Sequence, residues 1–362
     1  MVKKSLARVR LAATAGLMVC LLNACATTPD KLMFSMPANN LQPGQLQVWP
    51  RPPQTPRYIY IGDIRGESSR AKSDKKKGSA LSRFFSALVG LESESIPLIN
   101  LLRPQHGAVD DKGRIYVADP GRQAVFVFDE KSGEFFIWNE AELNIPFKSP
   151  VGIAIAENTI LVTDSEQGLV YVFTEEGQLI NTLGAEILQR PTGIAYDPLR
   201  KRVFVSDTKA DNIKIFNLQG ALLDVMGARG SNPGEFNHPT FLNYHDDKLY
   251  VADSLNARIQ IFNDADESIK IIGQRGLYIG NFTRPKGIAV DSDGNIYVTE
   301  SYYDHLLIFN PMGELLMSIG GSGALAGQFS QPTGVWIDSN DRLFVSDMLN
   351  SRISIFQYLG EN

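Results

Sequence analysis

Six acidic residues recur at comparable places along the chain, each at the end of a short apolar run. Six carboxylates brought to one level could form a cage for a metal ion, because carboxylate oxygens are good ligands for hard cations. An Asp at the end of a strand also commonly accepts hydrogen bonds from backbone N–H groups of nearby loops. The regular recurrence favours this structural role. The six residues are Asp119, Asp164, Asp207, Asp253, Glu300 and Asp347.

These acids belong to a longer repeat. Each copy contains a Pro, an apolar strand, a polar turn, a strand that ends in the acid, a polar loop and further short strands. The recurrent prolines are Pro104, Pro150, Pro191, Pro239, Pro285 and Pro332, at spacings of 46, 41, 48, 46 and 47 residues. Four antiparallel strands in a repeat of this length form one blade of a β-propeller. Six such blades must stack around a central channel, since a single blade cannot bury both of its faces.

Two segments, YVADSLNARIQIF (residues 250–262) and FVSDMLNSRISIF (residues 344–356), resemble the signature of the NHL-repeat family. The linkers GEFNHP, GNFTRP and GQFSQP resemble it as well, and the resemblance extends over residues 57–359. It implies an all-β fold, a six-bladed β-propeller of four-stranded blades. The last copy lacks its fourth strand, whereas residues 58–63 (YIYIGD) form a strand without a copy. We therefore predict that this N-terminal strand joins the last blade and closes the ring.

Some six-bladed relatives are metal-dependent lactonases or zinc lyases, which hold their metal in the channel. The zinc type needs several His, and this chain has four His in all. Two residues after each recurrent Pro stand His106, Gly152, Gly193, Phe241, Gly287 and Gly334, so that one His faces the channel. One residue after it stand Gln105, Val151, Thr192, Thr240, Lys286 and Thr333. We predict no metal, no cofactor and no catalytic residue; His106 either caps the channel or contacts a ligand there.

Propeller geometry places the inter-blade linkers and the loops between second and third strands on one face, here called the linker face. Arg and Tyr gather in these segments, which is the composition of protein-binding hot spots. We predict that this face binds a partner, although Arg258 and Arg352 could instead pair with neighbouring acids. The candidate residues are His106, Arg122, Arg229, Arg258, Arg275, Arg284, Tyr302, Tyr303 and Arg352, with Arg190 and Tyr278 on the same face.

One linker, residues 65–103, is much longer than the others and forms an inter-blade insert. Its first part is basic and includes Lys75, Lys76 and Lys77. Residues 79–91 then place apolar side chains, among them Phe84 and Phe85, at helical spacing. Such a helix either packs on the blades or serves as a lid or docking element for the partner.

The N-terminus carries a basic segment and a short apolar stretch, residues 11–22, that is too short for a membrane-spanning helix. The following LNAC, residues 22–25, resembles the lipobox of bacterial lipoproteins. The resemblance implies that residues 1–24 are a signal peptide, that Cys25 carries a lipid and an N-linked acyl chain such as palmitate, and that residues 25–56 are a flexible tether before the propeller (57–362). Ala26 after the cysteine favours the outer membrane, facing the periplasm or the surface. The alternative is an ordinary cleaved signal with a chance cysteine.

The net charge of −5 argues against a nucleic-acid partner, even though animal NHL propellers can bind RNA. We predict a non-catalytic, monomeric, lipid-anchored propeller in the cell envelope that binds an envelope or secreted protein. The alternatives are a metal-dependent lactonase-like or lyase-like hydrolytic enzyme and an assembly scaffold of an envelope complex. Metal content would distinguish the enzyme from the two binding functions.

Overall fold

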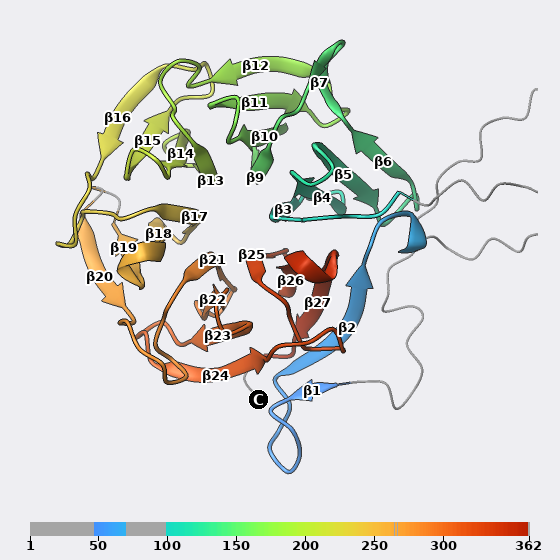
Figure 1. Cartoon of the computed structure of the whole chain (residues 1–362), viewed down its shortest axis with the longest axis vertical. Coiled ribbons are helices and arrows are strands. Elements are labelled where there is room, and N and C mark those ends of the chain that lie inside the picture. The colour runs from blue at the N-terminus through green and yellow to red at the C-terminus, as the bar shows by residue number, and fades with distance from the viewer. Residues whose placement is uncertain (1–46, 70–98, 264, 266, 361–362) are drawn as a thin grey trace, which may run out of the picture. The chain divides into compact units, whose positions relative to one another are not determined.

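The computed structural model describes residues 47–69, 99–263, 265 and 267–360. These residues form β-strands joined by turns, with short 3₁₀ turns at η2 (Glu67–Ser69), η3 (Ser254–Asn256) and η4 (Met348–Asn350). None of these described residues belongs to a helix long and apolar enough to cross a membrane. Figure 1 shows the sheets arranged as six blades in a ring. The predicted six-bladed, all-β architecture is therefore confirmed.

In each blade the first strand lies nearest the centre of the ring and the last lies at the rim (Figure 1). Blade one comprises β3 (His106–Val109), β4 (Arg114–Asp119), β5 (Ala124–Asp129) and β6 (Phe135–Trp138). Blade two comprises β9 (Pro150–Ala156), β10 (Thr159–Asp164), β11 (Leu169–Thr174) and β12 (Leu179–Leu183). Blade three comprises β13 (Pro191–Asp197), β14 (Arg202–Asp207), β15 (Asn212–Phe216) and β16 (Leu222–Met226).

The next two blades repeat this order. Blade four comprises β17 (Pro239–His245), β18 (Lys248–Asp253), β19 (Arg258–Phe262) and β20 (Ser268–Ile272). Blade five comprises β21 (Pro285–Val290), β22 (Ile296–Glu300), β23 (His305–Phe309) and β24 (Leu315–Gly320). The recurrent Pro begins the innermost strand in blades two to six, which suits Pro because the first residue of a strand need not donate to the ladder.

Blade six joins the two ends of the described chain. Its β25 (Pro332–Ile337), β26 (Arg342–Asp347) and β27 (Arg352–Tyr358) come from the C-terminal end, and β2 (Tyr58–Ile64) comes from the N-terminal end. Strand β2 pairs antiparallel with β27, from Tyr58 opposite Tyr358 to Ile64 opposite Ile353. The predicted closure by an N-terminal strand is confirmed, and it covers the edge that β27 would otherwise expose.

Two small elements were not predicted. Strand β1 (Val48–Trp49) pairs with β2 and adds a fifth strand to blade six, with the Trp49 ring packed edge-on against Phe356 at 5.6 Å. The tether predicted over residues 25–56 is therefore too long at its C-terminal end, because this packing holds residues 48 and 49 in the sheet. A hairpin of β7 (Glu140–Glu142) and β8 (Ile145–Pro146) occupies the linker between blades one and two.

Apolar side chains fill the spaces between blades. Between blades three and four, for example, Phe204 and Ile215 pack with Leu242, Val251 and Phe262, all of them buried. Burial of this kind contributes about 25 cal/mol for each Å² of apolar surface removed from water. The ring is therefore held together mainly by hydrophobic contacts between neighbouring blades.

Glycines allow the innermost strands to approach one another closely. A Cβ on Gly152 would lie 2.3 Å from the carbonyl oxygen of Thr192, and one on Gly193 would lie 2.3 Å from that of Thr240. Hydroxyl groups cross the same boundaries: the Thr163 hydroxyl donates to the Thr192 carbonyl at 2.8 Å, and the Thr240 hydroxyl donates to the Lys286 carbonyl at 2.9 Å. These contacts fix the backbone of the innermost strands at the end of the channel that opens on the linker face.

The described ends of the insert predicted over residues 65–103 lie together. Gly66 and Asn100 form an isolated antiparallel bridge, and the Leu101 N–H donates to the Arg65 carbonyl at 2.9 Å. The two described ends of the insert, at residues 66 and 100, are therefore paired with each other. The helix predicted over residues 79–91 lies outside the described residues.

Candidate functional site

The recurrent acids lie at the linker face, where each second strand ends. All six carboxylates accept hydrogen bonds from the backbone of the residues that precede the recurrent Pro of the same blade. Asp207 accepts from the N–H groups of Gln189 and Arg190 at 2.9 and 2.8 Å, and Glu300 accepts from those of Thr283 and Arg284. The corresponding bonds are made by Asp119, Asp164, Asp253 and Asp347. The acids therefore point toward the linkers and hold them in place.

Arg258 and Arg352 were assigned to the partner-binding face, but the structure buries both of them. Each begins the third strand directly opposite the acid that ends the second strand. Arg258 donates through Nε to Asp253 at 2.8 Å, and Arg352 donates through Nε to Asp347 at 2.6 Å. The remaining guanidinium N–H groups of Arg258 bond linker carbonyls. Those of Arg352 bond two linker carbonyls and the Asp63 carboxylate of β2. Of the two alternatives predicted for them, the structure has the ion pair, because antiparallel pairing turns these side chains inward onto their own acids.

His106 lies inside the channel and not on the linker face. Its ring stacks on Phe241 with the ring centroids 4.8 Å apart, and it also contacts Trp336. His106 belongs to blade one and Phe241 to blade four, on opposite sides of the ring, so this contact spans the channel. The Ile153 N–H donates to Nδ1 at 3.4 Å, and burial lowers the pKa of His106 to about 4. The imidazole is therefore neutral near pH 7, and with Phe241 it divides the channel.

On the linker-face side of these rings the channel opens into a hollow of about 480 Å³, here called the channel mouth. Its floor consists of residues that directly follow the recurrent prolines: Gln105, Val151, Thr192, Thr240 and Lys286. Its wall consists of linker and loop residues, among which the ionisable ones are Arg190, Lys209, His238 and Arg284. None of the described lining residues is acidic. A second hollow, of about 330 Å³, shares Arg284 and Lys286 with the channel mouth.

The four cations of the channel mouth, Arg190, Lys209, Arg284 and Lys286, differ from the cations that pack within the blades, such as Lys214 and Arg342. Within the described residues, their side chains make no ion pair and no hydrogen bond. By contrast, Lys214 is buried against Asp207 at 2.6 Å, and Arg342 bonds both Glu130 and Asp338. Burial, together with repulsion from Arg284 and Arg190, lowers the pKa of Lys286. Among the residues that the structure describes, the channel mouth is thus a region of positive charge without an acidic partner.

Sequence analysis placed Arg190 and Arg284 on the linker face but did not single out Lys286 or Lys209 as candidate site residues. The available signal was that Lys286 is the one charged residue among the six that directly follow the recurrent prolines. The convergence itself was not visible in the sequence, because Arg190 and Lys209 belong to blade three and Lys286 to blade five. Only the closed ring brings them to one place.

The other predicted face residues are at the surface. Arg122, Arg229, Arg275, Arg284 and Tyr302 are exposed, and Tyr303 is half-buried with its ring against that of Tyr302 at 4.9 Å. Arg122 donates to the Asn100 carbonyl and Arg275 to the Leu255 carbonyl. Cys25 and the predicted docking residues Lys75, Lys76, Lys77, Phe84 and Phe85 lie outside the described residues.

Acidic and His side chains do not gather into a metal-binding arrangement in the described part of the chain, where no group of three or more His, Cys, Asp or Glu is placed to hold an ion. His238, which lines the channel mouth, has its Nδ1 at 3.3 Å from an oxygen of Asp211.

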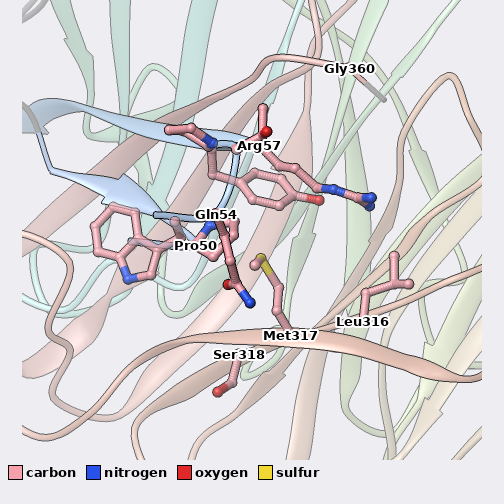
Figure 2. A pocket seen from close by; sticks show the side chains of 11 residues that line it. Pro50, Gln54, Arg57, Leu316, Met317, Ser318 and Gly360 are labelled. Atoms are coloured by element: carbon pink, nitrogen blue, oxygen red, sulfur yellow. The ribbon is translucent and has the colours of Figure 1, made fainter. Parts of the chain in front are cut away.

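A further hollow, of about 590 Å³, lies at the rim of the ring between the N-terminal hairpin and β24 (Figure 2). Figure 2 shows Gln54 reaching toward Met317, with Pro50 on one side and Arg57 and Gly360 on the other. The hollow is far from the channel in the arrangement of Figure 1, since β1 and β24 lie at the outer edge. It lies along the seam where the N-terminal segment meets blade five.

Two sequence families match parts of this chain. A family described as a 6-bladed beta-propeller matches residues 291–360, and a beta-propeller repeat matches residues 270–299. The chain is a six-bladed β-propeller. One curated relative, Protein brain tumor of Drosophila melanogaster, is 28% identical over 128 residues, a match that covers 34% of this chain and 12% of that protein.

Solved propellers resemble this propeller in fold. A virginiamycin B lyase from Staphylococcus aureus, crystallised with quinupristin as an inactive variant, superposes with a TM-score of 0.53 at 13% identity, over 71% of this chain and 95% of that one. An auxiliary nutrient binding protein from Bacteroides thetaiotaomicron superposes with a TM-score of 0.56 at 14% identity, over 72% of this chain and 70% of that one. One of these proteins is an enzyme and the other a binding protein, so the shared fold assigns neither role to this propeller.

Proposed function

We propose that this chain is a non-catalytic propeller of the NHL type, anchored by a lipid in the cell envelope, whose linker face binds a protein. The observation that carries the proposal is the mixture of exposed apolar and Arg side chains on that face. In the linker before blade five, Leu277 and Tyr278 are 80% and 85% exposed, next to Ile279 at 64%. Contiguous apolar side chains exposed on a protein surface commonly mark an interaction site.

The surroundings of these residues also suit a protein interface. Leu255 and Tyr302 are exposed in the neighbouring loops of blades four and five. Arg275 lies two residues before Leu277 and is held by its bond to the Leu255 carbonyl at 2.6 Å. Aromatic, aliphatic and Arg side chains together form the usual core of a protein interface, where a few of them carry most of the binding free energy.

Replacing Leu277, Tyr278 and Ile279 by Ser should abolish partner binding. We expect at least a tenfold loss in the amount of cross-linked partner captured from envelope extract, because the removal of hot-spot side chains costs about 2 kcal/mol or more. A matched control replaces Ile180, Leu223 and Ile269, which are 56%, 51% and 50% exposed on the outer strands of blades two, three and four. Equal capture by the two triple variants would contradict the proposal.

The proposed lipid anchor has a separate test. Replacing Cys25 by Ala should move the chain from the membrane fraction to the soluble fraction, because multiple acyl chains at one site are the source of stable anchoring. Cys20→Ala is the matched control, since Cys20 belongs to the predicted signal peptide and should leave with it. Fractionation, with the mass of the N-terminal peptide, measures the outcome. Membrane retention of Cys25→Ala at the level of Cys20→Ala would contradict the anchor.

A further inference from the structure

The channel mouth holds a cluster of cations apart from Leu277, Tyr278 and Ile279, the exposed apolar residues that carry the proposed protein interface. We propose that the channel mouth binds a small oxyanion with two or more negative charges, such as a phosphate ester or a polycarboxylate, between Lys286, Arg284 and Arg190. This inference goes beyond the proposed protein binding and does not depend on it. Its ligand lies at the centre of the ring, whereas the exposed apolar residues lie in a linker.

The first observation is that the described side chains lining the channel mouth include several cations and no acid. Arg190, Arg284, Lys209 and Lys286 line one hollow of about 480 Å³ with no acidic residue among its described lining residues. Charges of one sign in a concave, partly desolvated site attract counter-ions, because the surrounding low dielectric strengthens their field. The repulsion that lowers the pKa of Lys286 comes from Arg284 and Arg190, so these three groups act on one another. A bound anion relieves this repulsion.

The second observation is that several hydroxyl groups that line the channel mouth already have hydrogen-bond partners. Several hydroxyl groups of the channel mouth already donate to carbonyl groups of the next blade: Ser165 to Pro191, Thr208 to Pro239, Thr240 to Lys286 and Ser254 to Pro285. The donors that remain are mainly those of the cations. An acceptor-rich anion is therefore a better ligand for this hollow than a neutral sugar, because charge-assisted hydrogen bonds to carboxylate or phosphate are the strong ones.

The backbone that carries the cations is fixed, which lowers the entropic cost of binding. The Lys286 carbonyl accepts the Thr240 hydroxyl, and a Cβ on the next residue, Gly287, would lie 2.4 Å from the Thr333 carbonyl oxygen. The N–H groups of Arg190 and Arg284 donate to Asp207 and Glu300 of the recurrent acids. The same acids that hold the linkers thus position two of the cations at the channel mouth.

Isothermal titration calorimetry of the full chain with inorganic pyrophosphate and with citrate tests the proposal. We expect saturable 1:1 binding of at least one of them, with acetate at least tenfold weaker because it carries a single charge. Comparison of the two anions shows whether phosphate or carboxylate is the preferred source. Lys286→Met and Arg284→Gln should each weaken binding by about tenfold, the usual result of losing one charge-assisted hydrogen bond.

Arg229→Gln is the matched control, since Arg229 is an exposed cation of the linker face outside the channel mouth. It should change affinity less than about twofold, as expected for an exposed, screened charge that already pairs with Asp211 at 4.0 Å. No saturable binding of either anion, or an equal loss in Arg229→Gln and Lys286→Met, would overturn the proposal. Such a failure would leave the partner-capture result unchanged, so the two proposals fail separately.

A second readout follows from the protonation of Lys286. The charged and titratable groups near it are Arg284, Arg190, Lys209, His238, Tyr302 and Asp304. Because the pKa of Lys286 is lowered in the free protein, anion binding should raise it and take up a proton at alkaline pH. Titrations in two buffers of different ionisation enthalpy measure this uptake. It should disappear in Lys286→Met while any residual binding persists; equal uptake in both proteins would overturn the role of Lys286.

Discussion

Replacing Arg352 by Met should lower the free energy of unfolding by about 3–5 kcal/mol, the usual cost of removing one partner of a buried charge pair. Arg352 is 1% exposed and contacts three separate parts of blade six. It donates to Asp347 of β26 at 2.6 Å, to Asp63 of β2 at 3.0 Å and to the Gln328 carbonyl of the preceding linker at 2.8 Å. Met retains the apolar stem but leaves Asp347 without its cation and takes away one of the two Arg partners of Asp63, which keeps Arg65 at 3.0 Å.

Arg258→Met is the matched control, because Arg258 occupies the same place in blade four. It bonds Asp253 and three linker carbonyls, but blade four has no strand from the N-terminus and hence no counterpart of Asp63. Urea unfolding of both variants therefore separates the closing contact from the contacts common to the two blades. Arg352→Met should be the less stable by about 1–3 kcal/mol, the strength of a hydrogen bond to a charged group.

Limited proteolysis adds a local measurement to this comparison. If Arg352 ties β2 to the ring, cleavage before residue 64 should accelerate in Arg352→Met and stay near the wild-type rate in Arg258→Met. Equal stability of the two variants, with equal cleavage, would show that the Asp63 contact contributes nothing to closure.

The blades and their closure were predictable because they are encoded locally and repeatedly. Each copy carries its own Pro, its own acid and its own apolar runs, so that an ambiguous strand in one copy is identified by its place in the others. The unassigned strand at residues 58–63 and the missing fourth strand of the last copy then had one simple solution. Strand β1 was not predicted because Pro50, Pro52, Pro53 and Pro56 follow it closely, and prolines usually mark a segment as irregular.

The ion pairs of Arg258 and Arg352, which sequence analysis left open as an alternative to partner binding, could have been preferred from spacing alone. Each follows a recurrent acid by five residues, and antiparallel pairing places it directly opposite that acid. Such a pair at the start of a hairpin favours an ion pair over exposure. The cations of the channel mouth had no comparable local signal, because their proximity depends on blades that are far apart in the sequence. The blades can thus be predicted by comparing the copies along the sequence, whereas a site formed where several blades meet can be seen only in the closed ring.

His106 leads to the second large effect, a dependence of stability on pH. Burial lowers its pKa to about 4 in the folded protein, against an ordinary value of about 6.5 in an unfolded chain. Between these values the unfolded chain binds the proton and the folded chain does not. The contribution of His106 to stability is therefore complete above about pH 6.5 and is lost as the pH falls toward 4, by about 3 kcal/mol in total.

His106→Phe removes this titration and keeps an aromatic ring against Phe241 and Trp336. The variant loses the bond from the Ile153 N–H, which costs about 1 kcal/mol at neutral pH. It should nevertheless be the more stable protein at pH 4, so that the curves of unfolding free energy against pH for wild type and variant cross. Carboxylates that titrate in the same range are common to both proteins and cancel in the difference. Parallel curves from pH 7 to pH 4 would mean that His106 accepts its proton in the folded channel, and hence that the stack with Phe241 opens to water.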